Sequence, residues 1–114
     1  MTIDFNNMEA VSIPSFKGGE KEMLTKMFFD GTTRILHGVL VPGASIGEHT
    51  HTDSCEILFV VKGSGTIIDD GVSSAIEAGQ CTYCPKDHSH SLINTGAANL
   101  EFYAAVPKLI SPGD

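Results

Sequence analysis

Short apolar runs separated by turn residues make up most of the chain, and none of them has a convincing helical period. Several runs alternate apolar and polar residues or are rich in β-branched residues, which is typical of strands. The expected strands cover residues 11–16, 22–29, 32–41, 57–61, 66–69, 72–76, 80–84, 88–93 and 99–106. Asp70 and Gly71 stand between two of these runs, and this dipeptide strongly indicates a two-residue hairpin. The pattern predicts an all-β sandwich or barrel.

Residues 22–29 fit a helix as well as a strand. Phe28 and Phe29 lead directly into Asp30 and Gly31, and an aromatic pair followed by a turn signal favours a strand. We therefore expect no helix of ordinary length in the chain.

Two histidines and a glutamate lie close together in the middle of the chain. His49 and His51 are two residues apart, so on a strand both imidazoles point to the same side. Glu56 follows a short polar break and opens the next apolar run, so its carboxylate can meet the two imidazoles at one point. Imidazole and carboxylate donors suit borderline divalent metals.

Turn residues and a further histidine stand at regular distances around this group. The spaced residues are Gly43, His49, His51, Glu56 and Gly63, followed by Gly79, Pro85, His90 and Asn94. Their spacing resembles the two motifs of small single-domain cupins of the RmlC-like superfamily, Gly-x5-His-x-His-x3-4-Glu-x6-Gly and Gly-x5-Pro-x-Gly-x2-His-x3-Asn. Asp87 replaces the middle glycine of the second motif. Because Asp is tolerated in turns and in left-handed conformations, we expect that loop to form.

The resemblance implies a cupin-type double-stranded β-helix, which is a jelly-roll barrel. It implies that His49, His51, Glu56 and His90 bind one divalent transition metal, which would be Mn, Fe, Ni, Co or Zn. It also implies a homodimer and a small-molecule ligand or substrate. Dioxygenases, oxalate-type decarboxylases or oxidases, isomerases and lyases are the enzyme classes that it suggests.

Four protein ligands on a metal that prefers six leave two positions for water or substrate. We expect a metal-dependent enzyme in which a carboxylate or enediol of a small oxygenated molecule chelates the metal directly. Two alternatives stay open. One is a binding or sensing pocket without turnover, and the other is a barrel in which the metal only stabilises the fold.

Four other side chains are candidates for the pocket, and each has a plainer interpretation. His37 could act as a general base if its strand face points inward, although a histidine satisfied in a core or interface is commoner. His88 could assist the metal site, but we favour a solvent-exposed loop residue. Tyr103 alternates with Phe102, so one of the two faces inward and could contact a substrate. Arg34 would clamp a carboxylate if it pointed inward, but we favour a surface charge.

The three cysteines are interpreted as thiols without a redox role. Cys81 and Cys84 spell Cys-x-x-Cys, yet they fall in an expected strand, where residues three apart point to opposite faces. A shared metal or disulfide is therefore the less favoured alternative, and buried apolar thiols are expected. Cys55 is treated as structural.

Composition and charge narrow the function further. The chain has 114 residues and is 41% hydrophobic, so it can bury a core. We expect one domain over residues 1–114, with a flexible arm at 1–8 and a tail at 108–114. A net charge of −7 argues against nucleic acid and anionic membrane surfaces as partners. The chain shows no signal peptide and no membrane-spanning apolar run, so a cytoplasmic location with reduced thiols is predicted.

Overall fold

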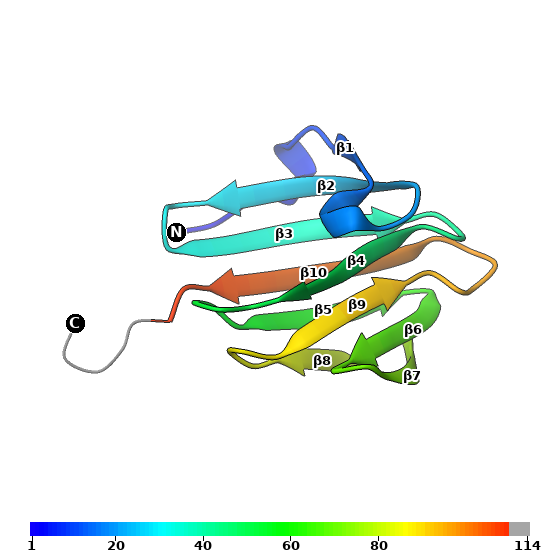
Figure 1. The fold of residues 1–114 in the computed structure, drawn as a ribbon. Coiled ribbons are helices and arrows are strands. Elements are labelled where there is room, and N and C mark those ends of the chain that lie inside the picture. The colour runs from blue at the N-terminus through cyan, green and yellow to red at the C-terminus, as the bar shows by residue number, and fades with distance from the viewer. Residues whose placement is uncertain (110–114) are drawn as a thin grey trace.

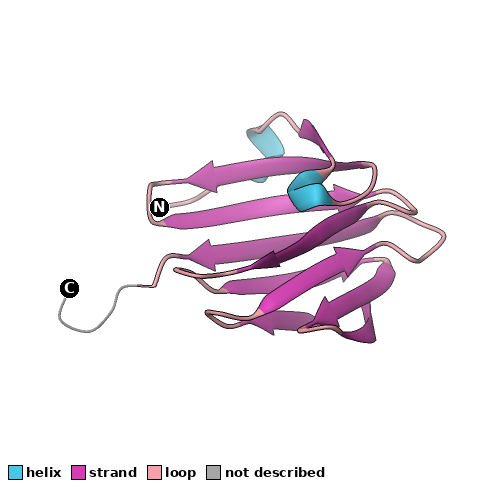
Figure 2. Ribbon diagram, viewed as in Figure 1, coloured by secondary structure: helices cyan, strands magenta, loops and turns pink. Residues whose placement is uncertain are grey.

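Two antiparallel β-sheets face each other in the computed structural model, which describes residues 1–109 (Figures 1 and 2). The larger sheet has six strands in the order β1-β2-β3-β10-β5-β8, and the smaller has four in the order β4-β9-β6-β7. The strands are β1 (Val11–Pro14), β2 (Glu22–Phe29), β3 (Thr33–Leu40), β4 (Ser45–Thr50), β5 (Glu56–Lys62), β6 (Ser64–Asp69), β7 (Val72–Glu77), β8 (Cys81–Cys84), β9 (Ser89–Ile93) and β10 (Leu100–Pro107). The predicted all-β fold is confirmed.

The ambiguous segment 22–29 forms a strand because its burial has a period of two. Met23 and Thr25 on β2 are buried, whereas Leu24 between them is exposed. β2 pairs with β1 on one side and with β3 on the other, so its backbone groups find partners in a sheet. Within residues 1–109, helix occurs only as two 3-10 turns, Phe5–Asn7 and Phe16–Gly18.

Two turns adopt the backbone conformation that their residues predict. Asp70 and Gly71 join β6 to β7 with φ of 47° and 82°, which is the positive-φ pair of a type I′ hairpin. Asp87 has φ of 70°, so it takes the left-handed conformation that a glycine would otherwise supply before β9. The replacement of glycine at this position therefore does not disturb the loop.

The core fills the space between the two sheets. Its buried side chains are Met23, Leu36, Leu40, Ala44, Ile46, Leu58, Val60, Ile67, Ile76, Leu92, Leu100, Phe102 and Ala104. Phe102 is fully buried, and its ring lies against the backbone of β3 at Gly38. A Cβ at Gly38 would come within 2.3 Å of the ring carbon Cζ, so only glycine admits the aromatic ring there. Of the pair Phe102 and Tyr103, the phenylalanine faces inward.

The residues before β1 lie on the outer face of the larger sheet. The 3-10 turn Phe5–Asn7 places the Phe5 ring 5.6 Å from the ring of Tyr103, and Lys26 Nζ donates a hydrogen bond to the Phe5 carbonyl at 3.0 Å. This part of the expected arm is therefore in contact with the sheet. Most of the expected tail, at 110–114, lies outside the described residues.

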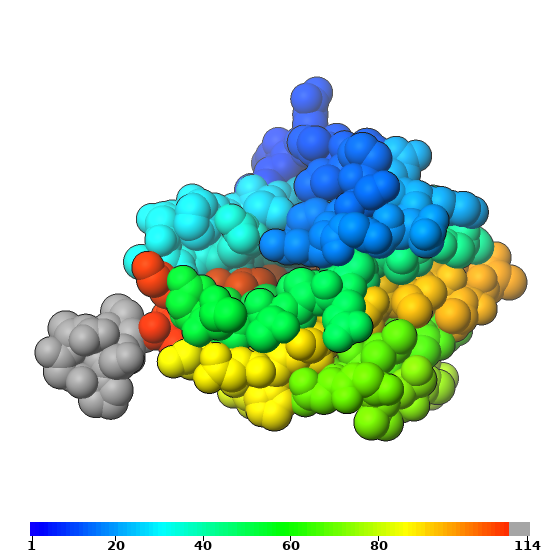
Figure 3. Space-filling view, viewed as in Figure 1, coloured from blue at the N-terminus to red at the C-terminus, as the bar shows by residue number. Residues whose placement is uncertain are grey.

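The 3-10 turn Phe16–Gly18 crosses strand β4 at very short range. Figure 3 shows this blue segment lying directly against the green strand. A Cβ at Gly47 would come within 2.0 Å of the Lys17 carbonyl oxygen, so the crossing depends on a glycine in β4. The crossing brings Phe16 and Lys17 to the open end of the space between the sheets.

Asn94, the last residue of the second motif, has a structural role. Its side chain is 1% exposed, and its amide nitrogen donates to the carbonyls of Leu40 at 2.7 Å and Ala98 at 2.9 Å. Its side-chain oxygen accepts from the backbone of Gly96 at 2.9 Å. The residue thus ties the turn after β9 to the end of β3 and satisfies buried backbone groups at both places.

Candidate metal centre

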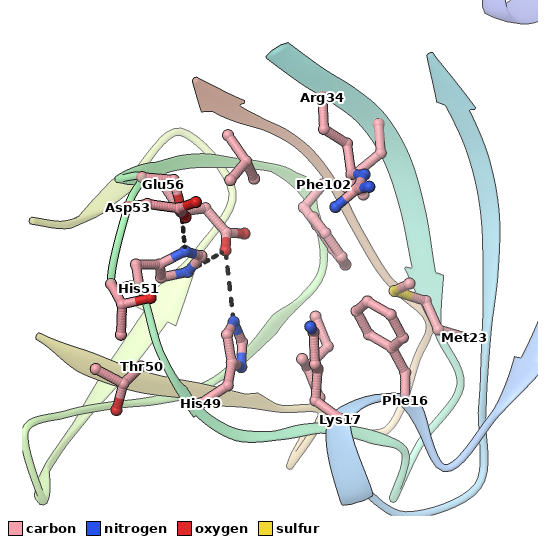
Figure 4. Close-up of a pocket in the computed structure, with 15 residues that line it drawn as sticks. Phe16, Lys17, Met23, Arg34, His49, Thr50, His51, Asp53, Glu56 and Phe102 are labelled. Carbon is pink, nitrogen blue, oxygen red and sulfur yellow. Dashed lines mark hydrogen bonds and ion pairs between the residues drawn. The ribbon is translucent and has the colours of Figure 1, made fainter. Parts of the chain in front are cut away.

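Four side chains from separate parts of the chain converge between the sheets. His49, His51, Glu56 and His90 each offer one donor atom, and these atoms all lie within 4.8 Å of one another. Three of the residues are buried, and His49 is partly exposed. Figure 4 shows His49, His51 and Glu56 on one wall of a pocket, with their polar ends directed at a common point. The convergence that the spacing predicted is observed.

Strand pairing explains why these residues meet. His49 on β4 and His90 on β9 are direct cross-strand partners, so their side chains stand on the same face of the smaller sheet. His51 comes directly after β4 and two residues after His49, and it points the same way. Glu56 opens β5 in the opposite sheet, and its carboxylate reaches across to the imidazoles. The site therefore spans both layers of the barrel.

The contacts within the group are too close for four unrelated polar side chains. His90 Nε2 lies 3.1 Å from the Nε2 atoms of both His49 and His51. Glu56 Oε1 lies 3.0 Å from the Nε2 atoms of His51 and His90, and 3.7 Å from that of His49. Three ring nitrogens and a carboxylate oxygen thus share one small volume. A cation bound between them would offset the repulsion among their lone pairs.

The other ring nitrogens fix how the imidazoles present their lone pairs. His49 Nδ1 lies 2.8 Å from the Gly47 carbonyl oxygen, which only accepts, so the proton is on Nδ1 and the Nε2 lone pair faces the centre. His51 Nδ1 is 3.1 Å from Ser54 Oγ, which can hold the same tautomer. His90 Nδ1 is buried and has no partner within residues 1–109. Such outer hydrogen bonds orient imidazoles in metal sites.

Glu56 carries a negative charge in this setting. Burial of its carboxyl group acts to raise the pKa, but the adjacent imidazoles of His49, His51 and His90 together outweigh burial and hold the pKa well below its usual range. The site therefore combines three nitrogen donors with one anionic oxygen donor. This donor set fits a divalent transition metal, and its residues could hold one.

A cavity of about 250 Å³ lies beside the four side chains, and we call it the metal pocket. Its apolar wall consists of Phe16, Met23, Leu36, Ile46, Phe102 and Val106. Apart from His49, His51 and Glu56, its polar lining consists of Lys17, Arg34, Thr50, Thr52, Asp53 and Ser54. A ligand bound at the metal centre would thus meet an apolar surface on one side and charged groups on another.

Arg34 is not a surface charge, and that prediction is wrong. The residue lies on β3 in phase with buried Leu36 and Leu40, and it lines the metal pocket. Its Nε is buried. Both faces of β3 carry apolar residues, so alternation alone does not say which face is inside.

His37 and Tyr103 do not reach the metal pocket. Both lie on the outer face of the larger sheet, where they are cross-strand partners with ring centroids 4.9 Å apart. His37 Nε2 is 2.7 Å from Glu101 Oε1, so the ring is already engaged. A role for His37 as a general base requires its side chain to point inward. Leu36 and Gly38 occupy the inward face of β3 instead. Neither residue is placed to contact a metal-bound ligand.

His88 is exposed and pairs with a surface carboxylate. Its Nδ1 lies 2.5 Å from Asp70 Oδ2, and both side chains are about half exposed. The hydrogen bond and the negative charge of Asp70 raise the pKa of His88. The side chain does not line the metal pocket, in agreement with the favoured interpretation of a solvent-exposed residue.

Cys55 and Cys84 are buried, but Cys81 is exposed, so the prediction of a buried thiol is wrong at that position. Cys81 is exposed and Cys84 is buried, so their side chains point to opposite faces, and all three thiols are free. Burial raises the pKa of Cys84 to about 11, with a further contribution from the negative charge of Glu56, so this thiol is a poor nucleophile. The cytoplasmic location expected from reduced thiols stays a prediction.

Several residues of the pocket were not found by sequence reasoning. Lys17 is separated from the motifs by a whole hairpin, and only the crossing over β4 brings it to the pocket. Asp53 and Ser54 lie between the two strands of the first motif, where the sequence showed only a polar break. Gly47 supplies the carbonyl that orients His49. No periodic signal marks any of these positions.

The helices found within residues 1–109 are too short and too polar to traverse a lipid bilayer.

Comparisons with known proteins agree with the two-sheet architecture and with the motifs. A family model described as "Cupin domain" matches residues 36–106. The "Oxalate-binding protein" of Thermotoga maritima is 30% identical over 112 residues, which cover 93% of each chain. The crystal structure of a predicted oxalate decarboxylase from Thermotoga maritima has a TM-score of 0.89 and 29% identity, covering 96% of this chain and 100% of that chain.

A more distant structure shares the fold alone. The crystal structure of an RmlC-like cupin from Shewanella frigidimarina is 18% identical, with a TM-score of 0.76 over 94% of this chain and 89% of that chain. Together with the observed sheets, these similarities confirm the predicted double-stranded β-helix, or jelly-roll barrel.

Proposed function

Because the chain belongs to the cupin domain family, we propose that it binds one divalent transition metal through its four converging side chains and receives a small carboxylate on that metal. The observation that carries this proposal is the donor set itself. Three imidazole nitrogens and the ionised carboxylate of Glu56 lie within 4.8 Å of one another at the wall of a 250 Å³ cavity. Such a centre has a place for a ligand directly beside it.

The names of similar proteins support a carboxylate ligand. A relative that matches this chain over 93% of its length is named an oxalate-binding protein, and a similar solved structure is described as a predicted oxalate decarboxylase. Oxalate is a small dicarboxylate that can chelate a divalent metal through two oxygens. We infer that the ligand of this chain belongs to the same chemical class.

The residues of the chain have separable tasks in this proposal. A bound metal would supply a Lewis acid with open positions for carboxylate oxygens. Glu56 would provide the one charged donor, while the Gly47 carbonyl and the Ser54 hydroxyl hold His49 and His51 in orientation. The apolar wall would exclude water from one side of the ligand, which strengthens its charge interactions inside the pocket.

Calorimetric titration of the metal-loaded protein with oxalate tests the proposal. We expect saturable binding to the loaded protein, with no measurable binding to the metal-free protein or to His51→Ala. A variant of the exposed histidine, His88→Ala, is the matched control and should bind oxalate like the unaltered protein. Equal affinity in the presence and absence of metal would contradict direct chelation.

Turnover is a second candidate function, in which the chain is a metal-dependent enzyme of the decarboxylase, dioxygenase, isomerase or lyase type. The observation that favours it is the presence of ionisable groups, Lys17 and Asp53, on the lining of the metal pocket. Groups of this kind can exchange protons with a bound substrate. The titrated sample decides the matter: oxalate recovered unchanged after long incubation favours binding alone, and release of one-carbon products favours catalysis.

We also propose that the chain forms a homodimer through the outer face of the larger sheet. Phe59, Val61 and Tyr83 on this face are about half exposed, and Tyr103 beside Phe59 is also exposed. Apolar side chains grouped on one face are typical of a protein–protein contact surface. These exposed side chains would lose their contact with water if a second copy covered them.

Light scattering coupled to gel filtration should give about twice the chain mass of 12.1 kDa. Phe59→Lys should shift the protein to the monomer mass, because a charge would be placed in the contact surface while the exposed position tolerates it in the fold. Val72→Lys, at a more exposed apolar position on β7, is the control and should leave the mass unchanged. A monomer mass for the unaltered chain would contradict the proposal.

A further inference from the structure

Arg34 is a partly buried cation without an ion-pair partner among the described residues. Its Nε is buried and lacks a hydrogen-bond partner within residues 1–109. None of the ion pairs found in that range involves Arg34. Leaving a buried N–H of a charged group unsatisfied costs free energy, so a native arginine in this position calls for a partner. Arg34 is also the single arginine of the chain.

The surroundings hold the guanidinium in one place. Its Cζ lies 4.6 Å from the ring centroid of Phe29, its cross-strand partner on β2, so a cation–π contact supports one side. The residue lines both the metal pocket and a neighbouring cavity of about 260 Å³ that contains Thr32 and Lys108. The guanidinium is therefore positioned at the boundary of two spaces, with one edge available to the metal pocket.

Lys17 adds a second cation to the same pocket. Figure 4 shows the terminal nitrogens of Arg34 and Lys17 entering the pocket from different walls, both apart from the metal ligands. Lys17 forms no ion pair within the described part of the chain either, although its ammonium group lies 5.7 Å from the Phe16 ring centroid. Two cations without an ion-pair partner among residues 1–109 thus line one cavity, in a chain with 14 acidic and 7 basic residues.

Arg34 and Lys17 thus give the metal pocket two positively charged groups besides the four converging side chains. We infer that Arg34, assisted by Lys17, binds the carboxylate oxygens that a small dicarboxylate leaves free when it chelates the metal. The inference rests on the proposed function. It names the ligand class as small dicarboxylates, because a guanidinium offers two parallel N–H groups that match a carboxylate. A cavity of about 250 Å³ has room for roughly eight water-sized volumes, which suffices for a short diacid.

Paired acids that differ by one carboxylate test this assignment. The metal-loaded protein is titrated with oxalate and glycolate, and with malonate and 3-hydroxypropanoate. All four can chelate a metal, but only oxalate and malonate carry a second carboxylate. We expect the unaltered protein to prefer the diacid of each pair by about 10- to 100-fold. Arg34→Gln should weaken diacid binding by about the same factor and leave hydroxy-acid binding and metal binding unchanged.

A charge control separates a direct contact from a general field effect. Lys108→Gln removes a positive charge that lines the neighbouring cavity but not the metal pocket, and it should leave the diacid preference unchanged. Lys17→Gln should weaken diacid binding less than Arg34→Gln does, because an ammonium group is a single point charge without the fork. If Arg34→Gln does not fold, Arg34→Lys keeps the charge, loses the fork and should weaken diacid binding about tenfold.

The outcomes distinguish this inference from the proposed function. The inference would be overturned if a folded Arg34→Gln or Arg34→Lys protein bound diacids with the affinity of the unaltered protein. The proposed metal site would not be affected by that result. A loss of metal binding in Arg34→Gln would likewise overturn it, since Arg34 would then act on the site's structure. Failure of the unaltered protein to bind metal would instead overturn the proposed function.

Discussion

Adding a divalent transition metal to the metal-free protein is expected to raise its Tm by about 10 °C or more when the free metal is at roughly 100 times its Kd. A ligand at that concentration stabilises the folded state by about 2.7 kcal/mol if it does not bind the unfolded chain. In a domain of about this size each kcal/mol corresponds to several degrees. The physical basis is the group of buried donors, whose members lie as close as 3.0 Å and are held in place before metal arrives.

Scanning calorimetry with Mn, Fe, Co, Ni and Zn in turn measures this shift. His90→Ala should show no comparable shift with any of the metals, because it removes the donor that contacts each of the other three. An unchanged Tm of the unaltered protein across all five metals would contradict a metal centre at this position. A large shift without oxalate binding would favour the alternative in which the metal only stabilises the barrel.

Glu56→Gln is expected to weaken metal binding by about 100-fold or more. Glu56 is the one anionic donor beside three imidazoles, and it is 7% exposed, so its charge is poorly screened by water. At a distance of about 4 Å a unit charge pair contributes roughly 4 kcal/mol under partly screened conditions, which corresponds to well over 100-fold in affinity. The glutamine has nearly the same shape, so the change removes charge rather than volume.

Competition with a chelating dye measures the metal affinity of this variant. Asp70→Asn is a matched control, because it neutralises a carboxylate that also contacts a histidine, His88, but at the surface. Its metal affinity should equal that of the unaltered protein. If Glu56→Gln retained full affinity, the carboxylate would not be a ligand, and a centre with three histidines alone would replace the four-donor proposal.

Most of the strands could be predicted from local sequence signals, because the formation of strands and turns depends on residues that are neighbours in the chain. The Asp70–Gly71 hairpin requires two positive φ values in succession, and the dipeptide supplies residues that tolerate them. The ambiguous segment 22–29 was resolved correctly by the turn that follows it. In each case the deciding interaction lies within a few residues of the chain, so the sequence contains the required information.

The four donors of the metal centre were also predictable, for a related reason. His49 and His51 share one side of an extended segment by period alone, and the pairing of β4 with β9 then brings His90 to the same face. The motif spacing reflects that pairing. The spacing alone did not predict the hydrogen bonds that orient the four side chains, such as the one between His49 and the Gly47 carbonyl.

The sequence by itself determined the strands and the turns, because these follow from backbone preferences and from the alternation of side chains, and its resemblance to the cupin motifs identified the four converging donors. Tertiary structure alone decided which face of β3 is inside. Arg34 and His37 lie on opposite faces of that strand, and both faces carry apolar neighbours, so only the packing of the second sheet turned Arg34 toward the pocket and His37 away. The same holds for Lys17, which reaches the pocket because its segment crosses β4 at Gly47, a contact between residues far apart in the chain.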